Sequence, residues 1–284
     1  MKHPKRPPGP QVLRLQLGRR LRALREAAGF SSQEEISVAV GWSAAKISRV
    51  ESGHGTLTQA ELEHLLATLE TPPAEAQVIE RLARDARKRG NYGKVSDWAR
   101  AYVGMEADAD ELRICYTGLV PGPLQTAAYA AAVLNTSVNV APADAPRLVQ
   151  ARVERYERLV QGPGDTDLHV ILGEEVIRRQ VGGRRVMKEQ LELLRDAAAR
   201  DNVTLQLLPF EAGEHAALDT SFTLVYLHDV GASYVYLEDL TSSTFLDRDP
   251  HLRVYEVIFR RLQITALSER ATLDLLDRAI HDLD

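Results

Sequence analysis

The sequence predicts two domains of different class: a mainly α N-terminal domain of five helices, followed by an α+β domain with a small mixed sheet. Three observations lead to this expectation. A chain of 284 residues is long for a single hydrophobic core. Its first third contains capped helical segments joined by short turns. The part after residue 164 alternates β-rich stretches with helical ones.

Charge is divided unevenly along the chain. Residues 1–100 carry 17 Lys and Arg against 11 Asp and Glu, and residues 101–284 carry 18 against 29. The net charges are therefore +6 and −11. A basic first third beside an acidic remainder is typical of a nucleic-acid-binding domain joined to an acidic one.

Composition narrows the class of protein. Cys115 is the only cysteine, which excludes a disulfide framework and a cysteine-based zinc site and favours a reducing cytoplasm. No apolar run approaches the roughly 20 residues of a membrane span. The N-terminal segment MKHPKRPPGPQ is basic and proline-rich and lacks the apolar core of a secretory signal. We expect a flexible basic arm over 1–12, which either contacts DNA phosphates or is a disordered leader.

The first three predicted helices are separated by glycines. Leucines at helical spacing predict a helix over about 12–28, which Gly29 ends. Serines followed three residues later by glutamates form a capping-box pattern that opens a second helix at 32–40. Gly41 suits a tight left-handed turn. A third helix over 43–52 then begins with a serine cap. Helix, glycine turn and capped helix together predict a helix-turn-helix.

Two further helices complete the N-terminal domain. The fourth is expected over 58–69, where Thr58 caps it and Glu61 stands three residues later. Pro72 and Pro73 end it. A fifth helix is expected over 74–89.

The outward side of the third helix is the predicted DNA-contacting surface. Ile47 and Val50 point inward, so the polar residues around them face outward. If this helix enters the major groove, its N-terminal half meets base edges. Arg49 can then bond a guanine in bidentate fashion, at roughly 1–3 kcal/mol of discrimination. The predicted DNA-binding residues are Gln33, Ser43, Ala44, Ala45, Lys46, Ser48 and Arg49.

The other members of this set have different expected roles. Lys46 and Ser48 suit either phosphate or base contacts. Ala44 and Ala45 can only pack, for example on a thymine methyl group. Gln33 opens the second helix and is placed to bond a phosphate or an adjacent base.

The N-terminal segment resembles the lambda-repressor-like (XRE-type) helix-turn-helix family over about 55 residues. The resemblance implies a DNA-binding function and a salt bridge between Arg25 and Glu51 that joins the first and third helices. The matching residues are Gln33, Glu35, Ile36, Gly41, Ser43, Ile47, Ser48, Arg49, Glu51 and Gly53.

The C-terminal part alternates helices and strands. Two of its expected strands flank helices and are therefore expected to pair in parallel through a right-handed crossover. Another two form a hairpin around HDVGAS. The expected helices are 98–116, 125–134, 144–161, 174–180, 186–200 and the tail 250–283, with a break at Ser268–Glu269; the expected strands are 168–172, 203–208, 221–227 and 234–237.

This part resembles the C-terminal domain of actinobacterial antitoxin-like regulators of the WhiJ type. The resemblance implies a developmental or antibiotic-related transcriptional regulator, often encoded beside a small protein that binds it. The matching motifs are VPGPLQTAAYA (120–130), RVERYERL (152–159), VGGRRVMKEQL (181–191), NVTLQLLPFEAGEHAAL (202–218), SFTLVYL (221–227) and VYLED (235–239).

Nothing in the C-terminal part forms a recognisable catalytic or metal-binding motif. The spacings of zinc and calcium sites, the nucleophile elbow and the phosphate-binding glycine loops are all absent. We therefore expect no enzyme activity, no cofactor and no metal. The side chains considered for acid–base chemistry are Glu174, Glu175, Arg184, Arg185, His215, Asp219, Glu238 and Asp239.

The predicted organisation is an arm (1–12), a helix-turn-helix domain (13–72), a helix and linker (73–97) with a hinge at 90–94, and a C-terminal sensing and dimerisation domain (98–284). The expected function is a cytoplasmic, homodimeric transcriptional regulator of double-stranded DNA. A partner protein or a small-molecule effector would control it through the C-terminal domain. One alternative is an antitoxin that neutralises a small co-encoded protein. A remote alternative is a small-molecule-processing enzyme fused to a DNA-binding domain.

Overall fold

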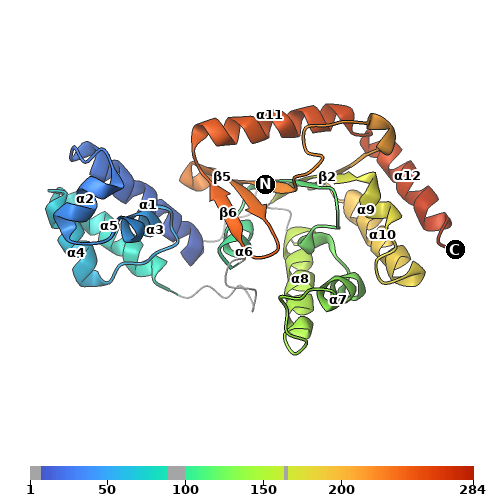
Figure 1. Cartoon of the computed structure of the whole chain (residues 1–284), viewed down its shortest axis with the longest axis horizontal. Coiled ribbons are helices and arrows are strands. Elements are labelled where there is room, and N and C mark those ends of the chain that lie inside the picture. The colour runs from blue at the N-terminus through green and yellow to red at the C-terminus, as the bar shows by residue number, and fades with distance from the viewer. Residues whose placement is uncertain (1–7, 89–99, 163–165) are drawn as a thin grey trace. The chain divides into compact units, whose positions relative to one another are not determined.

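The computed structural model of the protein describes residues 8–88, 100–162 and 166–284, which form two compact units (Figure 1). The head lies within Arg6–Asn91 and also includes Val103–Asp108. The body lies within Tyr92–Tyr102 and Ala109–Asp284. The predicted hinge at 90–94 falls outside the described residues, and so does most of the predicted arm.

Five helices build the N-terminal part of the head, as the sequence predicts. Their ends lie at most three residues from the expected ones, and each helix occupies the expected stretch of sequence. The helices are α1 (Pro10–Ala27), α2 (Gln33–Val40), α3 (Ala44–Glu51), α4 (Gln59–Thr68) and α5 (Pro73–Ala86).

All five helices contribute to one apolar core in the head. Its buried members include one large side chain from each helix: Leu21, Ile36, Ile47, Leu62 and Ile79. The sequence grouped α5 with the linker. In the structure α5 packs against α1 and α4, because Ile79 and two alanines on the same face are fully buried in that core. The folded head therefore extends to the end of α5.

Local capping fixes where the head helices begin. The hydroxyls of Ser32, Ser43 and Thr58 each accept a hydrogen bond from the backbone N–H three residues later. Glu61 completes a capping box by accepting from the Thr58 N–H at 2.8 Å. Gly41 ends α2 in the left-handed region, with a φ of 70°.

The body contains a six-stranded mixed sheet with the order β3-β2-β1-β4-β5-β6. β1, β2 and β3 pair in parallel, and β4, β5 and β6 continue the sheet in antiparallel pairs. The predicted parallel pair and hairpin are both present. The strands are β1 (Glu111–Tyr116), β2 (Asp167–Gly173), β3 (Val203–Leu208), β4 (Phe222–Leu227), β5 (Ala232–Glu238) and β6 (Ser243–Leu246).

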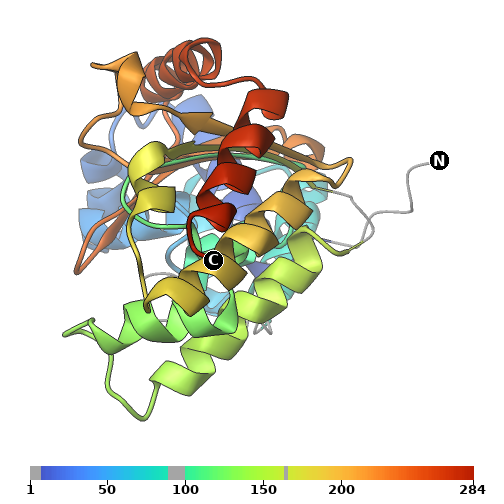
Figure 2. The ribbon, with the colours of Figure 1, turned by 90° about the vertical axis from the view of Figure 1, so that its right-hand side faces the viewer.

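Helices cover both faces of this sheet (Figure 2). α11 lies on one face, and α7, α8 and α10 lie on the other. The short helix α6 (Arg100–Glu106) contains residues of both units. The remaining elements are α7 (Ala127–Asn135), α8 (Ala145–Leu159), α9 (Glu174–Arg178), α10 (Arg184–Ala198), α11 (Asp249–Thr265), α12 (Glu269–His281) and the 3-10 turns η1 (Gly122–Leu124), η2 (Phe210–Ala212) and η3 (His228–Val230).

One prediction for the body was wrong. The expected helix over 98–116 ends at Glu106, and residues 111–116 form β1 near the centre of the sheet. The segment ELRICY is too short for periodicity to separate helix from strand. Pairing with β2 on one side and β4 on the other decides in favour of the strand. β6 was also not predicted.

The two faces of the sheet carry separate sets of buried side chains. Cys115, Phe222 and Val235 belong to the core beneath α11, to which the helix contributes Phe259. Burial raises the pKa of the Cys115 thiol to about 12.

No helix in the described part of the chain is long and apolar enough to cross a membrane.

Gly18 of α1 is expected to tolerate no side chain. A Cβ added there would lie 2.3 Å from the carbonyl oxygen of Glu51 and 2.6 Å from that of Val50. Although Ala is preferred over Gly in most helices, Gly18→Ala should lower the free energy of unfolding by about 1–3 kcal/mol through overpacking. Gly118→Ala is the control because its added Cβ meets nothing within 4 Å. Equal thermal stability of the two variants would contradict this account.

Candidate nucleic-acid interface

α3 presents one side to the core of the head and the other to solvent. Ile47, Val50 and Glu51 are buried. Ser43, Ala45, Ser48 and Arg49 are exposed, and Ala44 and Lys46 are half-buried. The outward side therefore holds most of the predicted DNA-binding residues.

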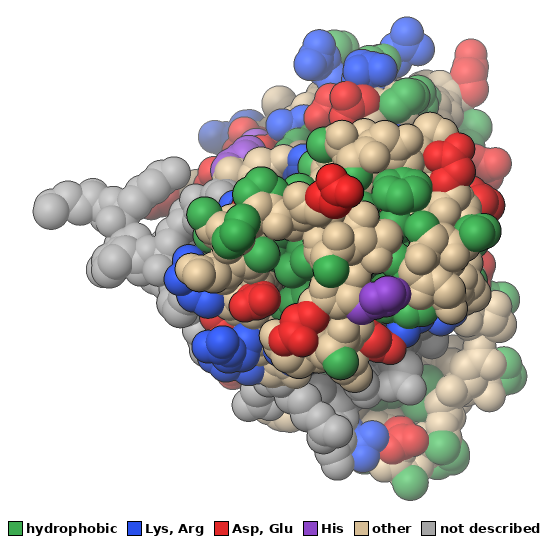
Figure 3. Space-filling view, turned by 90° about the vertical axis from the view of Figure 1, so that its left-hand side faces the viewer, with side chains coloured by type: hydrophobic (Ala, Val, Ile, Leu, Met, Phe, Trp, Pro, Cys, Tyr) green, Lys and Arg blue, Asp and Glu red, His purple; other side chains and the backbone are tan. Residues whose placement is uncertain are grey.

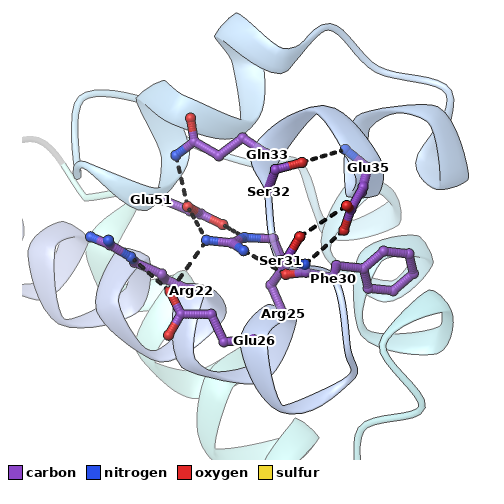
Figure 4. Close-up of polar contacts among 9 residues, drawn as sticks. All are labelled: Arg22, Arg25, Glu26, Phe30, Ser31, Ser32, Gln33, Glu35 and Glu51. Atoms are coloured by element: carbon purple, nitrogen blue, oxygen red, sulfur yellow. Dashed lines mark hydrogen bonds and ion pairs between the residues drawn. The ribbon is translucent and has the colours of Figure 1, made fainter.

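A buried ion pair fixes this helix in the head (Figure 4). Arg25 Nε donates to Glu51 Oε1 at 2.6 Å, and Arg25 Nη2 donates to Glu51 Oε2 at 3.3 Å. Arg25 Nη1 also donates to the Phe30 carbonyl at 2.7 Å. The hydrogen bond to Glu51 raises the pKa of the Arg25 guanidinium. The salt bridge that the family resemblance implied is therefore confirmed, and it joins α1 to the end of α3.

Gln33 takes part in the same network. Its Nε2 donates to Glu51 Oε2 at 2.8 Å, so the side chain connects the start of α2 to the end of α3. The sequence placed Gln33 at a phosphate or a base. In the structure its amide group is half-buried and engaged with a carboxylate. Gln33 therefore has a positioning role in the head in addition to any DNA contact.

Lys46 is held by two neighbours. Its ammonium group forms an ion pair with Glu61 of α4 and lies over the Trp42 ring, 4.3 Å from the ring centroid. The hydrogen bond from Lys46 is the main reason why the pKa of Glu61 falls to about 2. The sequence identified Lys46 but missed both partners. Trp42 stands four residues before Lys46, which was a usable signal, whereas Glu61 is brought close only by tertiary packing.

Arg49 and Ser48 differ from Lys46 in that their side chains are not held by neighbouring residues in the described part of the chain. Both are exposed, and within the described ranges no hydrogen bond or ion pair engages either side chain. The hydroxyl of Ser43 is used as the cap of α3, accepting from the Lys46 N–H at 3.3 Å. Ala44 and Ala45 offer methyl groups only. Arg49 and Ser48 are therefore the polar side chains of α3 that are ready to bind without first breaking a contact.

The positive charge of the head is not spread over its whole surface. The face of the head shown in Figure 3 carries acidic, apolar and neutral side chains across its centre, with few Lys and Arg side chains among them. A surface that binds DNA is expected to concentrate basic side chains. This face therefore lacks the charge pattern of a nucleic-acid interface.

Of the side chains considered for acid–base chemistry, all but Glu175 have local contacts in the described part of the chain that account for them as structural groups. Glu174 begins α9, pairs with Arg178 at 2.9 Å and accepts from the Phe210 N–H at 3.0 Å. Asp239 accepts backbone N–H groups of its own turn. Glu175 follows Glu174 in the first turn of α9. The remaining contacts are those of Arg184 (donating to the Asp282 carbonyl), Arg185 (paired with Glu189), His215 (accepting from the Ala217 N–H), Asp219 (accepting from the Thr220 hydroxyl) and Glu238 (accepting from the Tyr236 hydroxyl).

Removing one member of the buried ion pair is expected to destabilise the head strongly. Glu51→Gln leaves the buried Arg25 charge without its carboxylate, at a cost of about 3–5 kcal/mol of unfolding free energy. Glu26→Gln is a matched control. Glu26 also contacts Arg25, at 3.5 Å, but is 54% exposed, so the cost there should stay below about 1 kcal/mol. Urea denaturation measures both, and a smaller effect at Glu51 than at Glu26 would refute the assignment.

Releasing Lys46 is expected to change how binding to DNA depends on salt. Glu61→Gln keeps a capping side chain but removes the partner of Lys46. If Lys46 then contacts a phosphate, the slope of log K against log salt should steepen by about 0.9. Glu63→Gln on the same helix removes the same charge without freeing Lys46. Equal slopes for the two variants, measured by fluorescence anisotropy, would show that the ion pair does not withhold Lys46.

Two protein families match this chain. Residues 16–79 match the model of a helix-turn-helix domain, which covers most of α1 and runs into α5. Residues 99–278 match a domain of unknown function (DUF5753), which covers most of the body. A search of curated proteins found no match. Since the second model covers more than half of the chain, the protein belongs to the DUF5753 family and carries a helix-turn-helix domain ahead of that family's domain.

Proposed function

We propose that this protein is a sequence-specific transcriptional regulator that reads double-stranded DNA with α3. The observation that carries the proposal is the contrast between the two sides of that helix. Its inner side is fixed by the Arg25–Glu51 ion pair. Its outer side presents Arg49 and Ser48 to solvent. A rigid helix with available polar side chains is what base recognition in the major groove requires.

Each outward residue has a distinct role in this proposal. Arg49 donates two hydrogen bonds to a guanine, the commonest specific contact in protein–DNA complexes. Ser48 bonds a base or a phosphate, and Ala45 packs on a thymine methyl group. Lys46 reaches a phosphate only after leaving Glu61. So few direct base contacts give modest specificity for a single head.

A second copy of the chain would supply the missing specificity. α3 has only eight residues, so one head covers a few base pairs. A two-fold dimer places two such helices in successive major grooves, about 34–36 Å apart. We therefore propose a homodimer that binds a palindromic operator.

The body is proposed to control this binding without catalysing a reaction. It has its own sheet, its own cores and a large excess of acidic residues. A partner protein or a small-molecule effector that binds the body would change the affinity of the dimer for DNA. The resemblance to WhiJ-type regulators supports a role in the development or antibiotic production of an actinobacterium, in the cytoplasm.

Arg49→Ala is expected to abolish discrimination at one operator position per half-site. The operator is first selected from random duplexes by the wild-type protein. The ratio of operator affinity to random-sequence affinity should then fall by roughly 5- to 150-fold per half-site, the equivalent of about 1–3 kcal/mol.

Arg20→Ala provides the comparison. Arg20 is an exposed arginine of α1, and any phosphate contact it makes carries no sequence information. It should change both affinities by the same factor. An unchanged ratio for Arg49→Ala would place the reading surface elsewhere.

A further inference from the structure

The body contains a cluster of charged and aromatic side chains at the carboxyl ends of β1 and β5. Tyr116 ends β1, and Tyr236 and Glu238 lie at the end of β5. α8 covers this face of the sheet and contributes Arg152 and Arg155 (Figure 2). We call Arg152, Arg155, Tyr236 and Glu238 the arginine site. In sheets with parallel strands, ligands bind preferentially beyond the carboxyl ends of those strands.

The two arginines lie one helical turn apart and are held in place by neighbours. Arg152 Nη1 donates to Gln125 Oε1 at 2.6 Å, and Gln125 Nε2 donates to the Val120 carbonyl at 2.7 Å. The guanidinium of Arg155 lies over the Tyr102 ring, 5.6 Å from its centroid. These contacts fix the positions of two positive charges close enough to repel each other.

The loop after β1 is shaped around these arginines. A Cβ added to Gly122 would lie 2.9 Å from Arg155 Nη1, so a side chain there would displace the guanidinium. Gln125, which holds Arg152, is itself only 4% exposed. The loop residues therefore position both guanidinium groups in the way that a built binding site requires.

The sheet contributes the other members of the arginine site. The Tyr236 hydroxyl donates to Glu238 Oε2 at 2.8 Å, and the Tyr236 ring stacks on Tyr102 with centroids 4.0 Å apart. Thr223 lies beside Tyr236 in the register of β4 and β5, so both side chains point to the same face. Thr223 is 1% exposed, and its hydroxyl has no hydrogen-bond partner among the described residues. Such an unpartnered buried hydroxyl is unusual in a folded protein.

The electrostatics indicate a partly desolvated cluster of charges. Burial, together with the nearby charge of Arg155, lowers the pKa of Arg152 to about 10. Burial also raises the pKa of Glu238, although its side chain is exposed to solvent. An anion bound between the two guanidinium groups would relieve the repulsion between the arginines.

We propose that the arginine site binds the oxyanion group, carboxylate or phosphate, of a small-molecule effector. Planar guanidinium groups pair with such oxyanions through two parallel hydrogen bonds, and a pair of them fixes the orientation of the ligand. The carboxylate of Glu238 repels the anion and therefore limits its affinity. The same carboxylate accepts a hydrogen bond from a hydroxyl of the ligand, which favours ligands that carry a donor beside the oxyanion. This inference rests on the proposed function, because it identifies the effector whose binding to the body would control the head.

The test uses the full-length protein and two probes, sodium benzoate and inorganic phosphate, each titrated by calorimetry at constant ionic strength. At least one probe should bind with a dissociation constant of about 1 mM or tighter. Arg152→Gln and Arg155→Gln should each weaken that binding at least about tenfold, with Arg253→Gln on α11 as the control for the loss of one exposed positive charge. Benzoate binding alone would identify a carboxylate ligand, and phosphate binding alone a phosphorylated one.

Glu238→Gln keeps the test decisive if an arginine variant fails to fold. Removing this negative charge should strengthen binding of the probe several-fold, an effect that loss of structure cannot produce. The proposal is overturned if neither probe binds the wild-type protein, if Arg253→Gln weakens binding as much as the site variants, or if Glu238→Gln weakens it.

The same titration separates this inference from the proposed function. Operator affinity is measured with and without the saturating probe. A probe that binds the arginine site but leaves DNA binding unchanged supports the site and contradicts control by the body. Operator binding that needs Arg49, in a protein that binds neither probe, supports the DNA-binding function and contradicts the site.

Discussion

The buried ion pair between Arg25 and Glu51 is the interaction on which the head depends. It joins α1 to the end of α3, and through Gln33 it also reaches the start of α2. Two charges in an apolar core cost desolvation energy, which their hydrogen bonds must offset. The pair is therefore weak evidence for stability but strong evidence for a defined geometry. Since its charges are satisfied in one arrangement of the helices, it fixes the direction in which Arg49 points.

Local signals predicted the head well. Each boundary there depends on residues close in sequence, such as the caps Ser32, Ser43 and Thr58 and the turn at Gly41. The buried side of α3 also follows from helical periodicity. The partners of its polar side chains do not, because they come from other helices. Glu61 reaches Lys46 from α4, and that contact separates Lys46 from Arg49 although both looked equally available in the sequence.

The body contains elements whose secondary structure local sequence patterns do not predict. β1 was predicted as helix because its strand structure comes from distant partners. Its neighbours in β2 lie 56 positions further along the chain, and those in β4 lie 107 to 115 positions further. The arginine site shows the same limit. Arg152 and Arg155 lie one turn apart on α8, but Glu238 and Tyr236 join them only through the order of the strands. Long-range pairing, rather than local propensity, assembles both.

The ion pair between Lys46 and Glu61 bears on how long the protein stays bound to DNA other than its operator. Most DNA that such a protein meets is not its operator, and phosphate contacts dominate those encounters. A half-buried surface pair of this kind is worth about 1 kcal/mol, so a well-matched site can break it while a brief encounter need not. Because Lys46 is held by Glu61, it contributes less to these nonspecific phosphate contacts. The protein would therefore dissociate sooner from DNA that is not its operator. A small loss of total affinity would thereby give faster arrival at the correct sequence.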